Sequence, residues 1–258
     1  MHVHQIYTNS HLRNFTYLLD DGEGSIYCVD PYTDTLVLNY LDQLNGKLKA
    51  VINTHEHGDH IGGNTGLKKA TNCEIWAHEN AEGKIDSIDR YLKGNELIKL
   101  GDTYQLKVLD TPGHTFAHLC LMLMKGYSPE AIFTGDTLFN AGVGNCHNGG
   151  NPEILFETIH HQFQNLSDEV LVYPGHDYLE NNLRFTIDRE PSNLTAAELL
   201  ATENKQCDAT FLITNMELER DINTFLRLDN EEIKNKLSSD ELNKKQVFLK
   251  LRELRNKW

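Results

Sequence analysis

Short apolar runs separated by turn residues dominate the first two thirds of the chain. The runs at 15–21 and 25–30 flank a Gly-Glu-Gly segment and predict a β-hairpin. Residues 35–45 fit a helix between strands. Further strands are predicted over residues 49–54, 74–78, 104–113, 119–124 and 131–136. Helices interleaved with two groups of strands favour a layered α/β (α+β) architecture over a pure β-sandwich.

The pattern changes after residue 176. Glycines and short β-branched runs give way to Leu, Glu, Lys and Asn at helical spacing. We therefore expect a helical domain at 177–258, after a first domain at 1–176. The last segment, 238–258, begins with Ser and acidic residues that suit a helix N-terminus and ends in Lys and Arg that suit a C-terminus.

Composition narrows the kind of partner and compartment. The formal net charge of −14 disfavours nucleic acid, because phosphate binding rests on clustered Lys and Arg, so a small-molecule substrate is expected. No stretch approaches the ~20 continuous apolar residues of a spanning helix, and the N-terminal segment lacks the pattern of a secretory signal. The scattered cysteines lack a CxxC pair, which indicates a reducing compartment and a cytoplasmic protein. These cysteines are Cys28, Cys73, Cys120, Cys146 and Cys207.

The segment VINTHEHGDHIGGN, residues 51–64, places four metal-ligand side chains within six positions. If the preceding strand continues, His55 and His57 project from the same face and could reach one ion. Asp59 and His60 follow where the chain must turn, and they could serve a neighbouring second ion. A lone His is more often a solvated turn residue, but four such side chains together reverse that weighting.

Three more candidate ligands each follow an apolar strand and a glycine. His114 comes after a Pro-Gly turn, Asp136 comes directly after a predicted buried strand, and His176 follows another. Each is weak evidence alone, since a carboxylate after a strand is more often a cap or turn residue. Together they predict a metal cluster at one edge of a sheet, where rigid strands fix the ligands and loops admit substrate.

The ordered set HxHxDH at 55–60, TPGHT, TGDTLF and YPGH resembles the metallo-β-lactamase fold superfamily. Within it the chain resembles glyoxalase II, the hydroxyacylglutathione hydrolases, because NTFLR at 223–227 and FLKLRELRNKW at 248–258 are similar to that family's helical C-terminal domain. The resemblance covers essentially the whole chain. It implies an αββα sandwich up to about residue 176, followed by a smaller all-helical domain.

The resemblance also implies a ligand set for two divalent ions. One ion would take His55, His57 and His114, the other would take Asp59, His60 and His176, and Asp136 would bridge them. Asp59 and Asp136 are the candidate catalytic carboxylates. Zinc is the expected ion, although the mixed shell also suits iron or manganese. His118 is expected to support the shell rather than ligate, and His78 to be structural.

Thioester hydrolysis is the reaction that this site implies. A water held between two cations loses its proton near neutral pH and becomes the attacking hydroxide. A thiol has a pKa of ~8.5, so its departure needs little acid assistance. S-lactoylglutathione, cleaved to lactate and glutathione, is the expected substrate.

The match is imperfect where the glyoxalase II pattern holds the thiol carrier. Tyr178 fits its tyrosine after the last metal histidine, and Arg252 with Arg255 fit its two basic residues on the final helix. Asn145 and His147 stand where the family usually has Lys and Tyr. This difference is either neutral variation or a sign of a different thiol carrier, and both readings stay open.

Other functions stay in view. A persulfide dioxygenase of the same superfamily, with one iron, shares much of the metal motif but usually lacks so long a helical C-terminal unit. A dinuclear lactone or phosphodiester hydrolase would use the same site. A non-catalytic binding protein would be expected to have lost ligands, and here all seven positions are filled. The sequence leaves monomer and homodimer equally open.

Overall fold

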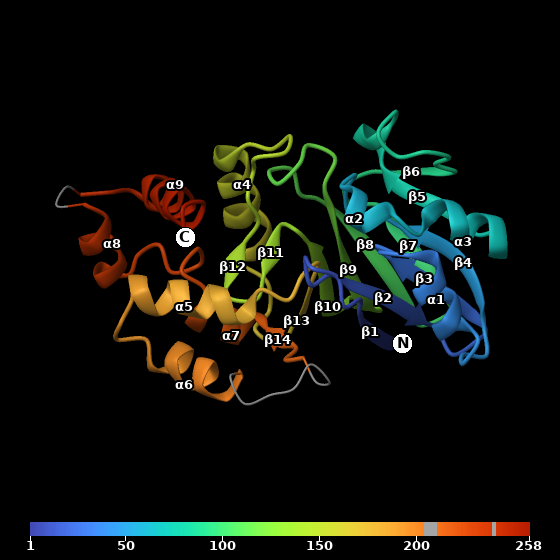
Figure 1. The fold of residues 1–258 in the computed structure, drawn as a ribbon, viewed down its shortest axis with the longest axis horizontal. Helices are drawn as coiled ribbons and strands as arrows, with labels where there is room; N and C mark the ends of the chain where they lie inside the picture. The colour runs from blue at the N-terminus through green and yellow to red at the C-terminus, as the bar shows by residue number, and fades with distance from the viewer. Residues whose placement is uncertain (204–210, 239–240) are drawn as a thin grey trace.

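Two six-stranded sheets pack face to face, with helices on both outer sides (Figure 1). The computed structural model describes residues 1–203, 211–238 and 241–258. The first sheet contains, in spatial order, β1 (His2–Tyr7), β2 (Phe15–Asp20), β3 (Ser25–Val29), β4 (Lys47–Ile52), β5 (Glu74–His78) and β6 (Arg90–Leu92). The second contains β14 (Thr214–Asn215), β13 (Leu171–Pro174), β10 (Ser128–Gly135), β9 (Leu119–Lys125), β8 (Tyr104–Asp110) and β7 (Leu97–Leu100).

The predicted strands are present, but β1, β6, β7 and the two-residue strands β11 (Leu138–Phe139), β12 (Gly142–Val143) and β14 were missed. The hairpin is confirmed, because β2 and β3 pair antiparallel with Leu18 opposite Cys28. From β3 to β6 the first sheet is parallel, and β10 and β13 of the second sheet also run parallel. The unpredicted β6 and β7 are edge strands of three and four residues, too short to show a clear pattern.

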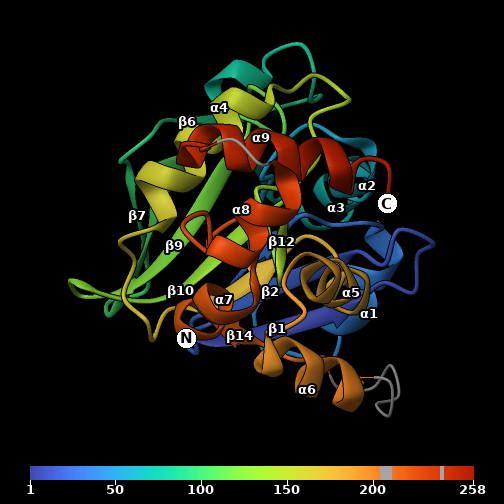
Figure 2. The same cartoon turned by 90° about the vertical axis from the view of Figure 1, so that its left-hand side faces the viewer.

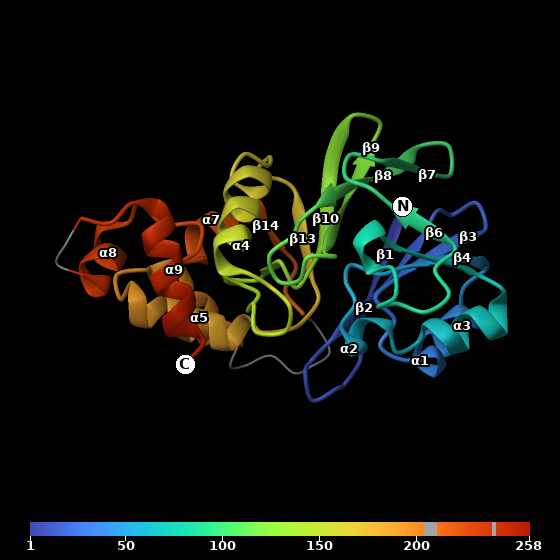
Figure 3. The same ribbon diagram turned by 90° about the horizontal axis from the view of Figure 1, so that it is seen from above.

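Strand alternation divides the core into layers. In β2, Tyr17 and Leu19 enter the layer between the two sheets, whereas Leu18 between them faces the outer helices. The outer face of the first sheet packs on α1 (Asp34–Leu41) and α3 (Asn64–Thr71). The outer face of the second sheet packs on α4 (Pro152–Thr158), the π-helical turn after it (Ile159–Phe163) and α9 (Lys244–Arg255). Figure 3 shows these helices at opposite sides of the sheets.

Residues 177–258 contribute helices and one strand. The helices are α5 (Leu179–Arg189), α6 (Leu194–Glu203), α7 (Met216–Ile222), α8 (Glu231–Leu237) and α9. They lie in front of the second sheet in Figure 2. The expectation of an all-helical unit needs one addition, because β14 pairs antiparallel with β13 and so joins the second sheet. The pairing is only two residues long, which leaves no periodic signal in the sequence.

The final helix begins later than predicted. Asn243 is its N-cap, and a reciprocal pair of hydrogen bonds with Gln246 forms a capping box. Ser238 instead ends α8, and residues 239 and 240 lie outside the described residues. The helix packs on α4 through Phe248 and Phe156, whose ring centroids are 5.5 Å apart.

The cysteines that the structure describes are free thiols. Cys28, Cys73 and Cys120 are buried free thiols, and Cys146 is partly buried. Cys207 lies outside the described residues. Among the described helices, none is both long enough and apolar enough to cross a membrane.

A buried carboxylate joins the helical unit to a small hairpin beside the second sheet. The hairpin consists of β11 (Leu138–Phe139) and β12 (Gly142–Val143), and its turn holds Ala141 at a φ of 57°. Glu219 of α7 is fully buried and accepts hydrogen bonds from Thr214 Oγ1, Ala141 N, Asn223 Nδ2 and Asn140 Nδ2 at 2.7 to 3.3 Å. Burial raises the pKa of Glu219, although these donors act in the opposite direction.

We expect Glu219→Ala to lower the free energy of unfolding by about 3 kcal/mol, because it leaves buried donors without an acceptor. Chemical denaturation measures the change. Glu217→Ala is the matched control, since Glu217 is an exposed carboxylate on the same helix, and it should stay within about 0.5 kcal/mol of wild type. Equal stability of the two variants would contradict this account of the hairpin.

Candidate metal centre

Seven candidate ligands meet at one edge of the two sheets, and each lies in a segment that connects a strand to the next element. The chain leaves β4 at Ile52 and reaches His55 and His57 before the short helix α2 (Gly58–Ile61). The strand thus ends earlier than the spacing argument assumed, and the two histidines converge from a loop. The remaining ligands follow from α2, the β8–β9 loop, the end of β10 and the end of β13: Asp59, His60, His114, Asp136 and His176.

The first group consists of three histidines. His57 Nδ1 lies 3.0 Å from His55 Nε2 and 3.0 Å from His114 Nε2. All three atoms lie within 4.8 Å of one another. Three ring nitrogens at this spacing can share one ion.

The second group consists of Asp59, His60 and His176, and Asp136 lies between the two groups. His60 Nε2 is 3.2 Å from His176 Nε2, and Asp59 Oδ2 lies 3.4 and 3.5 Å from these atoms. Asp136 Oδ2 is 3.5 Å from His114 Nε2 and 3.3 Å from His176 Nε2. The Asp136 carboxylate is thus within reach of both groups.

The outer nitrogen of each histidine faces an acceptor, which decides where its proton resides. His57 Nε2 donates to the carbonyl oxygen of Asn148 at 3.1 Å, and His114 Nδ1 donates to that of Asn145 at 2.6 Å. His176 Nδ1 donates to the carbonyl oxygen of Leu12 at 2.8 Å. Neutral imidazole carries one proton, so the inner nitrogens of these rings are left with lone pairs.

The other two histidines depend on Asp30, which the sequence reasoning missed. His60 Nδ1 lies 2.9 Å from Asp30 Oδ2, and Thr54 Oγ1 donates to the same oxygen at 2.6 Å. Because the Thr54 hydroxyl proton is used in this bond, Thr54 Oγ1 accepts a hydrogen bond from His55 Nδ1, which is 3.0 Å away. Asp30 follows β3 at a φ of 51°, and a positive φ at an aspartate cannot be read from the residue type.

The inner nitrogens and the carboxylate oxygens lie close together, and few of them carry a proton that could form a hydrogen bond between them. A cation stabilises such an arrangement. Asp136 Oδ1 is buried without a hydrogen-bond partner among the described residues. Although burial opposes its charge, the Asp136 and Asp30 carboxylates raise the pKa of His60 to about 9. Burial lowers the pKa of His55 well below its ordinary value. The residues present therefore fit divalent metal ions.

Two further histidines lie outside the ligand groups, as expected. His118 is buried, and its Nδ1 lies 2.9 Å from Thr111 Oγ1 and 3.1 Å from Thr137 Oγ1. Its Nε2 accepts from the backbone N–H of Asp136 at 3.1 Å, so it supports the carboxylate between the groups. His78 pairs with Asp110 at 3.2 Å, away from both groups.

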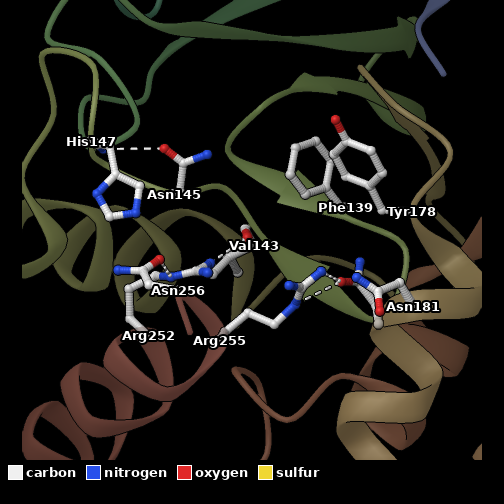
Figure 4. Close-up of a pocket in the computed structure, with 10 residues that line it drawn as sticks. Phe139, Val143, Asn145, His147, Tyr178, Asn181, Arg252, Arg255 and Asn256 are labelled. Atoms are coloured by element: carbon white, nitrogen blue, oxygen red, sulfur yellow. Dashed lines mark hydrogen bonds between the residues drawn. The ribbon is translucent and has the colours of Figure 1, made fainter. Parts of the chain in front are cut away.

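A pocket of about 330 Å³ adjoins the second group (Figure 4). The Tyr178 ring stacks on His176 with a centroid separation of 4.9 Å, and Phe139 packs against both rings. The pocket thus begins beside a candidate metal ligand. It is lined by Phe139, Val143, Asn145, His147, Tyr178, Asn181, Asn182, Arg252, Arg255 and Asn256.

The structure brings together all five residues that the sequence suggested for the thiol carrier, and adds asparagines. Arg252 is 5% exposed and donates through Nη1 to the carbonyl oxygens of Val143 and Gly144 at 2.8 and 3.0 Å. Arg255 donates through Nε and Nη2 to Asn182 Oδ1. Burial lowers the pKa of Arg252 to about 10, and Arg255 beside it acts in the same direction. Within the described chain, neither guanidinium pairs with a carboxylate.

Comparison with known proteins agrees with this geometry. Residues 14–176 match the family model described as the metallo-beta-lactamase superfamily, and residues 177–258 match that of the hydroxyacylglutathione hydrolase C-terminus. A hydroxyacylglutathione hydrolase of Nitrosococcus oceani is 45% identical, and one of Polaromonas sp. is 43% identical, each over 100% of both chains.

Solved structures share the fold. The crystal structure of ETHE1 from Myxococcus xanthus has a TM-score of 0.68 at 23% identity and covers 99% of this chain and 98% of its own. The di-iron-bound form of TTHA1623 has a TM-score of 0.59 at 24% identity, with 86% and 100% coverage. With both family models matched in order and relatives aligned from end to end, the chain belongs to the hydroxyacylglutathione hydrolase (glyoxalase II) family of the metallo-β-lactamase superfamily.

Proposed function

We propose that this protein is a metal-dependent thioester hydrolase that cleaves hydroxyacylglutathione, with S-lactoylglutathione as the first substrate to test. The observation that carries the proposal is the pocket with two guanidinium groups that have no carboxylate partner among the described residues, beside seven metal-ligand side chains. Relatives 43 to 45% identical over their full length are named hydroxyacylglutathione hydrolases.

The seven side chains would hold two divalent ions, zinc by preference of the donor set. Bound divalent ions lower the pKa of water and polarise a carbonyl group, which is the chemistry that thioester hydrolysis needs. Asp136 would bridge the ions, and His118 would fix Asp136 through its backbone N–H. Asp59 accepts a hydrogen bond from Asn14 Nδ2 at 2.7 Å, which holds its carboxylate toward His60 and His176.

The pocket suits an anionic, amide-rich thiol carrier. A buried guanidinium without a carboxylate partner is costly, and a substrate carboxylate would compensate it. The two arginines make the pocket locally positive, although the net charge of the chain is −14. Burial raises the pKa of Tyr178, so its hydroxyl stays protonated and can donate to the ligand. We propose residues 177–258 as the substrate-binding domain, since they supply Tyr178 and both arginines.

The roles of Arg252 and Arg255 differ in this proposal. Arg252 Nη1 donates to two carbonyl oxygens at the end of the hairpin. Arg252 therefore both holds the wall of the pocket in place and contributes positive charge to it. Arg255 donates to the neutral Asn182 oxygen and lies over the Phe185 ring, and among the described residues its Nη1 makes no hydrogen bond, so Nη1 is available to a ligand. Asn145 and His147 line the same pocket.

The compartment and assembly complete the proposal. We propose a cytoplasmic enzyme, in keeping with a similar Arabidopsis thaliana protein named as the cytoplasmic hydroxyacylglutathione hydrolase, 31% identical over 95% of this chain. Monomer and homodimer remain the two assemblies to distinguish. A persulfide dioxygenase with one iron is the competing function, and metal content separates it from the dinuclear hydrolase.

Asp136→Ala should remove most hydrolysis of S-lactoylglutathione and reduce the bound metal from two ions per chain to one or none, because the carboxylate between the groups is lost. Elemental analysis and thiol release measure the two effects. Asp102→Ala changes an exposed carboxylate in the β7–β8 turn and serves as the control. One iron per wild-type chain, with oxygen consumed on a persulfide substrate, would favour the dioxygenase instead.

Arg255→Ala should raise KM for S-lactoylglutathione while kcat and metal content stay near wild type. A charge-assisted contact contributes ~1.5–3 kcal/mol, which corresponds to roughly one to two decades in KM. Lys257→Ala removes an exposed cation just after the same helix and should leave KM unchanged. If the two variants had the same KM, α9 would be a packing element and not a clamp.

A further inference from the structure

The loop that lines the pocket with Asn145 and His147 also contacts the first histidine group through its main chain. His114 Nδ1 donates to the Asn145 carbonyl oxygen, and His57 Nε2 donates to the Asn148 carbonyl oxygen. One four-residue turn therefore supplies the outer acceptors for two of the three histidines in that group. The third, His55, has its acceptor in Thr54.

The main chain on both sides of this turn packs closely against the segments that carry His114 and Asp136. A Cβ at Gly150 would lie 2.2 Å from the carbonyl oxygens of Gly113 and His114, and one at Gly144 would lie 1.8 Å from that of Asp136. Only glycine permits this approach. Asn151 N also donates to the Gly113 carbonyl oxygen at 2.8 Å. Both ends of the turn are thus fixed, and its interior decides where the two carbonyl groups point.

The side chain of Asn145 holds that interior. Its Oδ1 accepts the backbone N–H of His147 at 3.1 Å, as the dashed line in Figure 4 shows. An asparagine that binds the N–H two residues on forms an Asx turn, which sets the local direction of the chain. The oxygen of Asn145 is therefore engaged within the turn rather than free for a ligand.

We infer that Asn145 is a positioning residue for the first metal group: its side-chain oxygen holds the 145–148 turn whose carbonyl oxygens orient His114 and His57. A lysine has no acceptor and could not make this hydrogen bond. The chain thus has an ordered support where the glyoxalase II pattern has a cation. The inference rests on the metal-dependent site of the proposed function but not on the identity of its substrate.

Outer acceptors fix the tautomer and direction of ligand imidazoles, and loss of such a partner typically weakens metal binding 10- to 100-fold. Asn145→Ala should therefore weaken the binding of one zinc ion by roughly tenfold. Asn145→Asp keeps the acceptor oxygen and should stay within about threefold of wild type, on the same reasoning. His147→Ala keeps the backbone N–H donor and is the matched control, with zinc affinity unchanged.

The measurement is zinc titration of the full-length, metal-free protein against a chromophoric chelator, with circular dichroism to verify the fold of each variant. Imidazole N–H signals in NMR of the zinc-loaded protein give a second readout. The protons on His57 Nε2 and His114 Nδ1 should be protected from solvent exchange in wild type and Asn145→Asp, and exposed in Asn145→Ala. This readout separates a positioning effect from the added charge of the aspartate.

Wild-type zinc affinity in Asn145→Ala, or equally weak binding in Asn145→Ala and Asn145→Asp, would overturn the inference. Equal exchange protection in all variants would do the same. Failure of the proposed function has a different signature. Zinc-loaded wild type would then bind both ions and release no thiol from S-lactoylglutathione, while the differences in zinc affinity between variants would persist.

Discussion

Everything at the candidate centre depends on the hydrogen bonds that hold the outer nitrogens of five imidazoles. When the ring is neutral, each bond commits one nitrogen to a proton and leaves the other with a lone pair directed inward. The acceptors are diverse: a carboxylate, a threonine hydroxyl and three carbonyl oxygens. Few of them belong to the ligand motifs themselves. The main contribution of the fold is therefore to place the hydrogen-bond acceptors of the histidines, more than to place the histidines themselves.

This dependence explains why the site lies where the two sheets end. Rigid strands bring the ligand loops to one edge, and the same edge gathers the segments that supply the acceptors. Leu12 comes from the β1–β2 connection and Asp30 from the end of β3, far in sequence from His176 and His60. Long-range pairing of this kind makes the centre a property of the whole sandwich.

The sequence pointed to the candidate ligands more directly than to the residues that support them. Histidine and aspartate carry their chemistry in the residue type, so HxHxDH and the three later motifs could be singled out in the sequence, and their order carried the resemblance to the superfamily. The hydrogen bond from His114 ends on a backbone carbonyl oxygen, and every residue has one. Asp30 depends on a positive φ, and β14 on a two-residue pairing, neither of which leaves a pattern. The sequence alone showed only that Asn145 stands where the family usually has a lysine. The hydrogen bond from His147 N to the Asn145 side chain became visible only in the structure.

The two-residue strand β14 has a consequence for how the chain can be divided. It covers the edge of β13, and Met216 directly after it belongs to the core beneath α4 and α9. A chain cut after residue 176 would therefore leave β13 with an open edge and an uncovered apolar layer, which is the condition for strand addition between molecules. The C-terminal unit thus protects the sandwich from self-association, and any transplant of the catalytic half alone would have to replace that protection.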